Sequence, residues 1–291
     1  MVNKIFDYYK PMIENRIDEL LPEENAPYNE VIRAARYSLK LGGKRIRPII
    51  MMEFCRLFGG RAEDALDFAL ALEMIHTYSL IHDDLPCMDN DDMRRGKPSC
   101  HKAFSEDMAL LAGDGLLTEA FTVAANAMVS DSVKVKAISV LSQMAGFRGM
   151  LGGQVVDLSF VKNPPDIASL QCMYDLKTGC LLRAAAVIGA YTANADDVDV
   201  KKADLYAKKV GLAFQIIDDI LDKTADAAVL GKPIGSDEKN DKTTFVTLLG
   251  LEGAKTEAEK LTNEAVEIVD SFNGDTENIK ALTSYLLNRN F

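Results

Sequence analysis

Apolar residues recur along this chain at the three- and four-residue spacing of amphipathic helices, whereas the alternation expected of strands is scarce. The long segments are rich in residues that favour helices, and Gly- or Pro-containing breaks separate them. The pattern predicts helices near residues 3–20, 28–41, 48–58, 63–85, 105–129, 132–147, 150–160, 167–191, 200–224, 242–250, 254–272 and 276–289. No long linker or repeat interrupts this series, so the sequence predicts an all-α bundle forming a single domain over residues 1–291.

Two of these helices are apolar on nearly every side yet carry one narrow polar stripe. In the helix near 63–85 the stripe consists of His76, Ser79 and Asp83. In the helix near 200–224 it consists of Gln215, Asp218, Asp219 and Asp222. Burying bare carboxylates is costly unless a partner or a cation compensates their charge. We therefore expect both stripes to face one shared polar cavity.

Each stripe ends in an acidic cluster, HDDLPCMDNDD at 82–92 and DDILD at 218–222. Pro86 should distort or end the first helix, so we expect a local bulge to bring Asp89 back beside Asp83. Ligand sets made only of carboxylates suit Mg²⁺, which also binds waters and substrate phosphates. Either cluster alone could be a solvated loop or a helix cap. Two clusters that both follow buried helices point to a cation site.

Basic residues that could hold phosphate groups lie near both clusters. GGKRIRP at 42–48 places three cations at a helix start, Arg94 and Arg95 follow the first acidic cluster, and Lys177 precedes Thr178 in an otherwise apolar helix. Each cation alone could be a solvated charge, except Lys177, whose leucine neighbours indicate a buried stem. The chain has no GxxxxGK[ST], HExxH or GxSxG pattern, which argues against a P-loop, a zincin or an α/β-hydrolase.

Composition and charge indicate which binding partners and which cellular compartment to expect. The net charge of −11 disfavours binding to nucleic acid or to an anionic membrane. Five cysteines without a CxxC pair indicate neither a disulfide framework nor a zinc site, so we expect a reducing, cytoplasmic setting. The N-terminus lacks the apolar core of a signal peptide, and no run approaches the length of a membrane span.

The chain resembles the trans-isoprenyl diphosphate synthase family, and its motifs are most similar to those of bacterial farnesyl diphosphate synthases. The motifs that carry this resemblance are GGKRIRP at 42–48, EMIHTYSLIHDDLPCMDNDDMRRGKPSCH at 73–101, LAGDGLL at 111–117, GGQVVDL at 152–158, KTGCLLRAA at 177–185, FQIIDDILD at 214–222 and LGKPIGSDEKNDKTTF at 230–245. The resemblance implies a helical bundle of the isoprenoid-synthase type around a deep central cavity, assembled as a homodimer. It also implies Mg²⁺ as the cofactor, with three ions per site when substrate is bound and Mn²⁺ as a substitute.

The resemblance implies roles for individual residues. Asp83, Asp89 and Asp218 match the family's metal ligands, Asp84 and Asp222 match supporting carboxylates, and Asp83, Asp84, Asp89, Lys177 and Asp218 form the catalytic set. The residues that match the isopentenyl diphosphate site are Lys44, Arg47, His76 and Arg95. The residues that match the allylic diphosphate site are Arg94, Lys177, Thr178, Gln215, Lys232 and Lys242.

The implied reaction is the condensation of isopentenyl diphosphate with dimethylallyl or geranyl diphosphate to (2E,6E)-farnesyl diphosphate. In this family the residues five and four positions before the first motif, here Tyr78 and Ser79, help to limit product length. A tyrosine about 7–8 Å along the helix from Asp83 should stop growth at C15, although Tyr78 could also be an ordinary core aromatic. Synthases of C10 or C20 products remain alternatives. A class I terpene cyclase and a non-catalytic subunit fit less well, because GGKRIRP and both aspartate motifs are present.

Overall fold

The computed structural model describes residues 1–224 and 243–287, and it confirms the all-α prediction. The main helices are α1 (Val2–Leu20), α2 (Asn29–Leu39), α3 (Ile46–Leu57), α4 (Leu66–Asp83), α6 (Glu106–Asn126), α7 (Asp131–Ala145), α8 (Met150–Phe160), α9 (Ile167–Tyr174), α10 (Cys180–Thr192), α11 (Asp197–Thr224), α14 (Phe245–Asp270) and α15 (Glu277–Leu287). The shorter elements are η1 (Ala62–Ala65), α5 (Cys100–Ala103), η2 (Asp175–Gly179) and one antiparallel pair, β1 (Met93–Arg94) with β2 (Lys97–Pro98).

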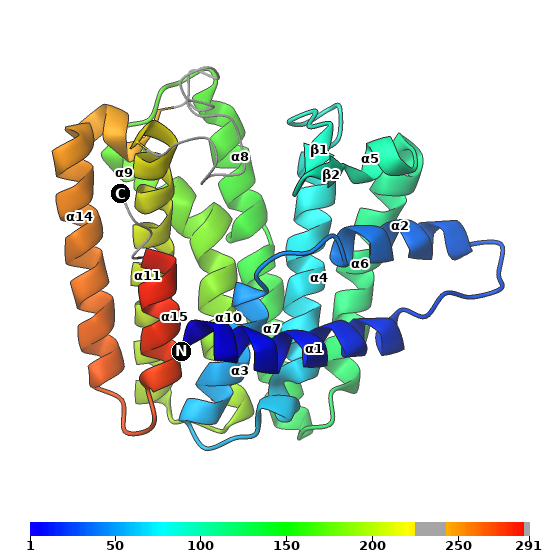
Figure 1. Cartoon of the computed structure of the whole chain (residues 1–291), viewed down its shortest axis with the longest axis horizontal. Coiled ribbons are helices and arrows are strands. Elements are labelled where there is room, and N and C mark those ends of the chain that lie inside the picture. Colours follow the sequence, from blue (N-terminus) through cyan, green and yellow to red (C-terminus); the bar gives the residue numbers. More distant parts are fainter. Residues whose placement is uncertain (225–242, 288–291) are drawn as a thin grey trace.

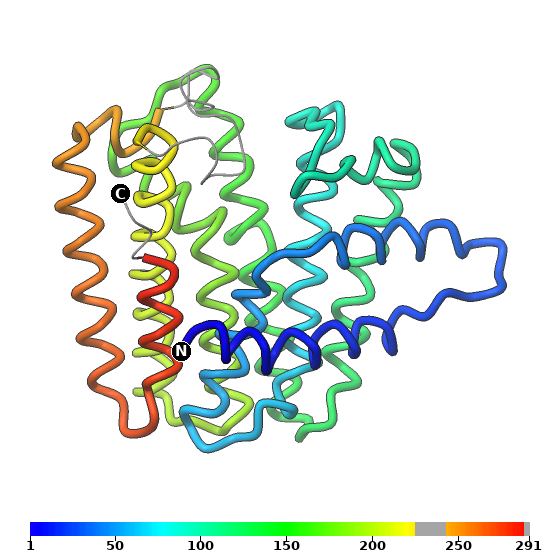
Figure 2. Tube along the Cα trace, in the orientation of Figure 1, coloured from blue at the N-terminus to red at the C-terminus, as the bar shows by residue number. Residues whose placement is uncertain are grey.

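The long helices stand side by side in a bundle, and α1 and α2 cross its face as a hairpin (Figures 1 and 2). Within the bundle, α4 packs against α3 and α6, α10 packs against α3, α7 and α11, and α11 packs against α14. The buried apolar side chains of α1 through α15 form one continuous core. The ends of α4 and α11 that carry the two aspartate clusters lie at the same end of the bundle (Figure 1).

Helix α4 ends where the sequence predicts a disturbance. Its last residue is Asp83, three positions before Pro86, and the chain then folds back on itself. The backbone N–H of Asp89 donates to the carbonyl of Asp83 at 2.9 Å. Asn90 adopts a left-handed conformation, with φ of 53°, and its N–H donates to the Leu85 carbonyl at 3.2 Å. This tight fold brings Asp89 back beside Asp83, as predicted from the proline.

Two local departures from regular helix geometry bear on the site or its support. The predicted helix 167–191 is interrupted by a π-helical turn over Asp175–Gly179, a feature that often marks functional positions. The α14 span contains a non-helical residue, Gly250, with φ of 72° and ψ of 166°. That kink agrees with the predicted separation of helices near 242–250 and 254–272.

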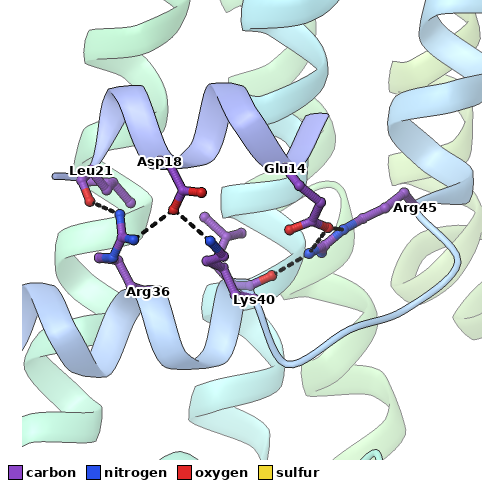
Figure 3. A network of polar contacts seen from close by, with 7 residues as sticks. Glu14, Asp18, Leu21, Arg36, Lys40 and Arg45 are labelled. Atoms are coloured by element: carbon purple, nitrogen blue, oxygen red, sulfur yellow. Dashed lines mark hydrogen bonds and ion pairs between the residues drawn. The ribbon is translucent and has the colours of Figure 1, made fainter. Parts of the chain in front are cut away.

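The α1–α2 hairpin is held together by charged contacts (Figure 3). Asp18 accepts hydrogen bonds from Arg36 at 2.7 Å and from Lys40 at 2.5 Å. Arg36 also donates to the carbonyl of Leu21. Exposed ion pairs of this kind contribute little each, but several that share one acceptor fix the angle between the two helices.

Helix α6 is long and apolar enough, by length and composition alone, to cross a membrane. This differs from the expectation that no segment would meet that test. The helix carries Asp114 and Glu119, and its buried face packs against α2, α4 and α7. Core helices of globular domains pass the same test, so the finding does not assign α6 to a membrane.

Candidate active site

A cavity of about 460 Å³ opens between the start of α3, the middle of α4 and the helices α10 and α11. That volume lies within the usual range of small-molecule sites. All four residues predicted to hold isopentenyl diphosphate line it, namely Lys44, Arg47, His76 and Arg95. Thr178, Leu182, Phe214 and Leu286 also line it. The cavity lining therefore combines several basic side chains with apolar ones.

The GGKRIRP loop is shaped by a buried arginine that sequence analysis did not assign to the site. Arg45 is only 2% exposed and adopts a left-handed conformation, with φ of 54°, just before α3. Its guanidinium pairs with Glu73 of α4 at 2.9 Å and Glu14 of α1 at 2.7 Å, and it donates to the Leu39 carbonyl at 2.6 Å. Arg45 is thus an anchor that orients its neighbours toward the cavity.

Close packing of backbone against side chain places Arg95 in the cavity wall. A Cβ on Gly43 would lie 2.7 Å from Nη1 of Arg95, and Gly43 has φ of +118°, so this position requires glycine. Arg95 also donates to the carbonyl of Gly42. The glycine pair thus lets the 42–48 loop and the hairpin 93–98 meet at the cavity.

Burial and like charge dominate the electrostatics of the basic wall. The pKa of His76 lies well below its usual value because the half-buried ring is desolvated and lies near the positive charges of Arg47 and Arg95. His76 is therefore a neutral imidazole at physiological pH. Its Nε2 lies 3.4 Å from Nη1 of Arg47, and the buried Nε of Arg47 has no hydrogen-bond partner among the described residues. Such an unsatisfied cationic group is suited to an anionic ligand.

The surroundings of Asp83 disfavour the ionised form of its carboxyl group. Burial raises its pKa to about 6, and the nearby charges of Asp89 and Asp84 add to the shift, while Lys177 and Arg94 oppose it. A carboxylate that burial and like charges disfavour is a good ligand for a cation that restores the balance.

Asp84 and Arg94 form an ion pair. Asp84 is 2% exposed and receives hydrogen bonds from Nε of Arg94 at 3.1 and 3.2 Å, and Nη2 of Arg94 also contacts it. Nη2 of Arg94 lies 3.3 Å from Asp91 as well. In this arrangement Arg94 neutralises the first motif, so its predicted contact with allylic diphosphate would require Arg94 to be shared or released.

The aspartates of the second motif have different surroundings. Asp219 is 8% exposed and accepts hydrogen bonds from the Tyr174 hydroxyl at 2.8 and 2.9 Å and from the backbone N–H of Phe245 at 2.9 Å. Asp219 therefore ties α9 and the start of α14 to α11. Asp218 is half-buried and Asp222 is 4% exposed.

The π-turn presents Lys177 and Thr178. Nζ of Lys177 pairs with Asp157 of α8 at 2.6 Å, and the Thr178 hydroxyl donates to Oε1 of Gln215 at 3.2 Å. A Cβ on Gly153 would lie 2.3 Å from the backbone nitrogen of Lys177, so α8 approaches η2 as closely as glycine allows.

The two candidate chain-length residues, Tyr78 and Ser79, lie on α4 shortly before Asp83. Tyr78 is 7% exposed, and its ring meets His82 edge to face. The Ser79 hydroxyl donates to the His76 carbonyl at 2.9 Å. Two allylic-site candidates, Lys232 and Lys242, lie outside the described residues.

The carboxylate pair fits magnesium in its chemistry. Among residues 1–224 and 243–287, no group of three or more ligating side chains is close enough to form a complete metal site. Magnesium commonly uses one or two carboxylates together with waters and substrate phosphates. The Asp83–Asp89 pair therefore offers the type and number of protein ligands that a magnesium ion needs. The oxygen-only donors and the raised pKa of Asp83 agree with that type of site.

Comparison with known proteins gives matches over nearly the whole length of the chain. A polyprenyl synthetase profile matches residues 29–286. The farnesyl diphosphate synthase of Micrococcus luteus is 43% identical over 95% of each chain. A putative chloroplastic geranylgeranyl pyrophosphate synthase of Arabidopsis thaliana is 44% identical over 99% of this chain and 83% of that protein. Relatives with different products are thus about equally similar.

Solved structures of prenyltransferases also match nearly the whole chain. An FPP/GFPP synthase from Zymomonas mobilis superposes with a TM-score of 0.89 at 34% identity, over 98% of both chains. A geranyltransferase from Helicobacter pylori, in complex with magnesium and isoprenyl diphosphate, superposes with a TM-score of 0.81 at 33% identity, over 98% of this chain and 96% of that one. These matches show that the chain belongs to the polyprenyl synthetase family of magnesium-dependent prenyltransferases that act on isoprenyl diphosphates.

Proposed function

We propose that this enzyme is a farnesyl diphosphate synthase. It would join isopentenyl diphosphate to dimethylallyl diphosphate and then to geranyl diphosphate, giving (2E,6E)-farnesyl diphosphate and releasing diphosphate at each step. The observation that carries the proposal is the 460 Å³ cavity, whose basic wall contains Arg47 with an unpartnered Nε. Synthesis of C10 or C20 products is the alternative, because relatives of both the farnesyl and geranylgeranyl types are similar.

The basic wall of the cavity is the proposed site for isopentenyl diphosphate. Lys44, Arg47 and Arg95 supply charge-assisted hydrogen bonds to the diphosphate. Neutral His76 can donate one further hydrogen bond without adding to the crowding of positive charge. The apolar wall, which includes Leu182 and Phe214, accommodates the hydrocarbon portion.

The aspartate motifs are the proposed metal site, with Asp83, Asp89 and Asp218 as ligands. Asp84 and Asp222 support them, and Asp84 does so through its pair with Arg94. Magnesium, when bound, neutralises the diphosphate charge that develops as the allylic C–O bond breaks. We propose three ions per site in the presence of substrate, with Mn²⁺ as a possible replacement.

The chain's own residues orient the allylic diphosphate and bear part of its charge. We propose that Lys177 and Arg94, whose charges both lower the pKa of Asp83, contact the leaving group, with Arg94 shared between Asp84 and the diphosphate. Thr178 and Gln215, already hydrogen-bonded to each other, would position its oxygens, and Lys232 and Lys242 are proposed to contribute further charge.

As the C–O electron pair passes to diphosphate, the alkene of isopentenyl diphosphate forms the new C–C bond. The proton then lost passes to the released diphosphate. Holding both substrates in one cavity makes this attack effectively unimolecular.

Product length is the finer part of the proposal. Tyr78 is a buried ring on α4, five residues before Asp83, or about 7–8 Å along the helix. A chain that grows from the diphosphate site toward this ring meets a rigid obstacle, so we propose termination at C15. Ser79 has its hydroxyl turned back to the helix and leaves Tyr78 as the larger barrier.

The oligomeric state and cellular location are also proposals. The bundle exposes apolar side chains on α6 and α8, with Leu110 at 48%, Leu111 at 49% and Val155 at 61% exposure. Such a surface suits a second copy of the chain, so we propose a homodimer. We propose a single domain over residues 1–291, a cytoplasmic location, and no nucleic-acid or integral-membrane partner, which agrees with the net charge of −11.

Incubation with labelled isopentenyl diphosphate, dimethylallyl diphosphate and Mg²⁺ tests the function directly. We expect mainly C15 product after dephosphorylation. Mainly C20 product would keep the chemistry and overturn the chain-length assignment. Absence of any condensation would favour a class I terpene cyclase, which ionises one diphosphate, or a non-catalytic subunit.

A further inference from the structure

Tyr78, the proposed barrier to chain growth, is in contact with a second ring on α4, that of His82. We propose that His82 is a positioning residue for product length, because its ring contacts α6 and packs against the ring of Tyr78. This inference rests on the proposed function, in which Tyr78 is the barrier to chain growth.

His82 lies one helical turn after Tyr78 on the same face of α4. The two ring centroids are 5.7 Å apart and the ring planes meet at 77°, an edge-to-face arrangement. Aromatic pairs favour this geometry because the edge of one ring carries positive charge and the face of the other carries negative charge. The imidazole therefore supports one orientation of the tyrosine ring over others.

The imidazole is itself fixed from the side of α6. Its Nε2 lies 3.1 Å from the carbonyl oxygen of Leu110. A carbonyl oxygen can only accept, so Nε2 carries a proton and donates it to this bond. A Cβ on Gly113 would lie 2.1 Å from Nε2 and 2.5 Å from Cδ2 of His82. The imidazole thus occupies the space that the missing side chain of Gly113 leaves open.

These contacts form a chain of support from α6 to the proposed barrier. The α6 backbone sets the position of His82, and His82 limits the orientations open to Tyr78. An elongating prenyl chain that presses on Tyr78 would have to displace both rings and break the Leu110 hydrogen bond. Product length would therefore depend on a residue that need not touch the prenyl chain.

The direct test compares the products of His82→Ala and His82→Gln with those of the parent enzyme. Loss of one aromatic edge contact should raise the ratio of C20 to C15 product in His82→Ala about 3- to 10-fold. Glutamine retains an N–H donor that can reach the Leu110 carbonyl, so His82→Gln should recover part of the parent ratio. Total isopentenyl incorporation and the melting temperature of each variant show whether the site and fold remain intact.

A pair of glycine variants on α6 tests the same support without changing either ring. Gly113→Ala forces the imidazole to move, and the clash falls on the end of a side chain, which the fold can accommodate. Gly115→Ala is the matched control, because a Cβ there meets nothing within 4 Å. We expect Gly113→Ala to change the C20-to-C15 ratio and Gly115→Ala to leave it at the parent value.

The outcomes separate this inference from the proposed function. Longer products in Tyr78→Ala, with parent-like products in His82→Ala and Gly113→Ala, would overturn the role of His82 and leave the function standing. Parent-like products in all three would overturn both the role of His82 and the barrier role of Tyr78. Absence of condensation by the parent enzyme would overturn the proposed function itself.

Discussion

Replacing Asp83 by asparagine should stabilise the metal-free protein while removing its activity. In the fold, burial and the neighbouring carboxylates raise the pKa of Asp83 from 3.8 to about 6. The ionised carboxylate therefore costs free energy in the folded chain at neutral pH. Asparagine occupies nearly the same volume without the charge, so the variant avoids that cost.

The size of the effect follows from the two pKa values. Moving from 3.8 to about 6 corresponds, at about 1.36 kcal/mol for each tenfold change in proton affinity, to about 3 kcal/mol as an upper limit. Asp83 is partly exposed, and water reduces such a cost, so we expect a gain of about 1–2 kcal/mol. For a domain of this size that gain raises Tm by roughly 2–6 °C.

The pH dependence has a definite sign. A carboxyl whose pKa is higher in the fold than in the unfolded chain favours the folded state at low pH, and this contribution is lost as pH rises from 3.8 to about 6. The advantage of Asp83→Asn should therefore be complete above pH 6 and absent below about pH 4.

Thermal unfolding in EDTA at several pH values measures the effect, and exposed Asp7 on α1 supplies the control variant Asp7→Asn. Added Mg²⁺ with a substrate analogue should stabilise the parent more than the variant, because binding to the folded state alone raises its stability. The reasoning fails if Asp83→Asn is no more stable than the parent at pH 7.5, or if its advantage persists unchanged at pH 4.

Further variants test other parts of the structure. Arg45→Met leaves Glu73 buried without its partner and should lower the free energy of unfolding in urea by about 3–5 kcal/mol, whereas adding Glu73→Leu should recover much of the loss. Asp157→Asn removes the 2.6 Å partner of Lys177 and should change KM for the allylic substrate more than KM for isopentenyl diphosphate; equal changes would contradict the assignment. Tyr174→Phe removes a hydroxyl donor to buried Asp219 and should destabilise the fold by about 1–3 kcal/mol with a small effect on kcat.

The helical architecture was readable from the sequence because hydrophobic periodicity is a local property. The described helices lie close to the predicted ranges, and the disturbance at Pro86 and the break near Gly250 occur where the residues indicate. The short hairpin at 93–98 and the π-turn at 175–179 were not predicted. Both depend on contacts with distant segments, such as α8 against Lys177, which no local pattern records.

The sequence by itself also determined which side chains share a helical face, since spacing sets direction on a helix. It therefore placed His76 and Asp83 on one stripe. Only the tertiary structure decided which partner each polar group meets. Asp219 ties α9 and α14 to α11, and Arg45 anchors the loop that presents Lys44 and Arg47. Spacing along one helix fixes where a side chain points, whereas the neighbour it reaches depends on how the other helices pack.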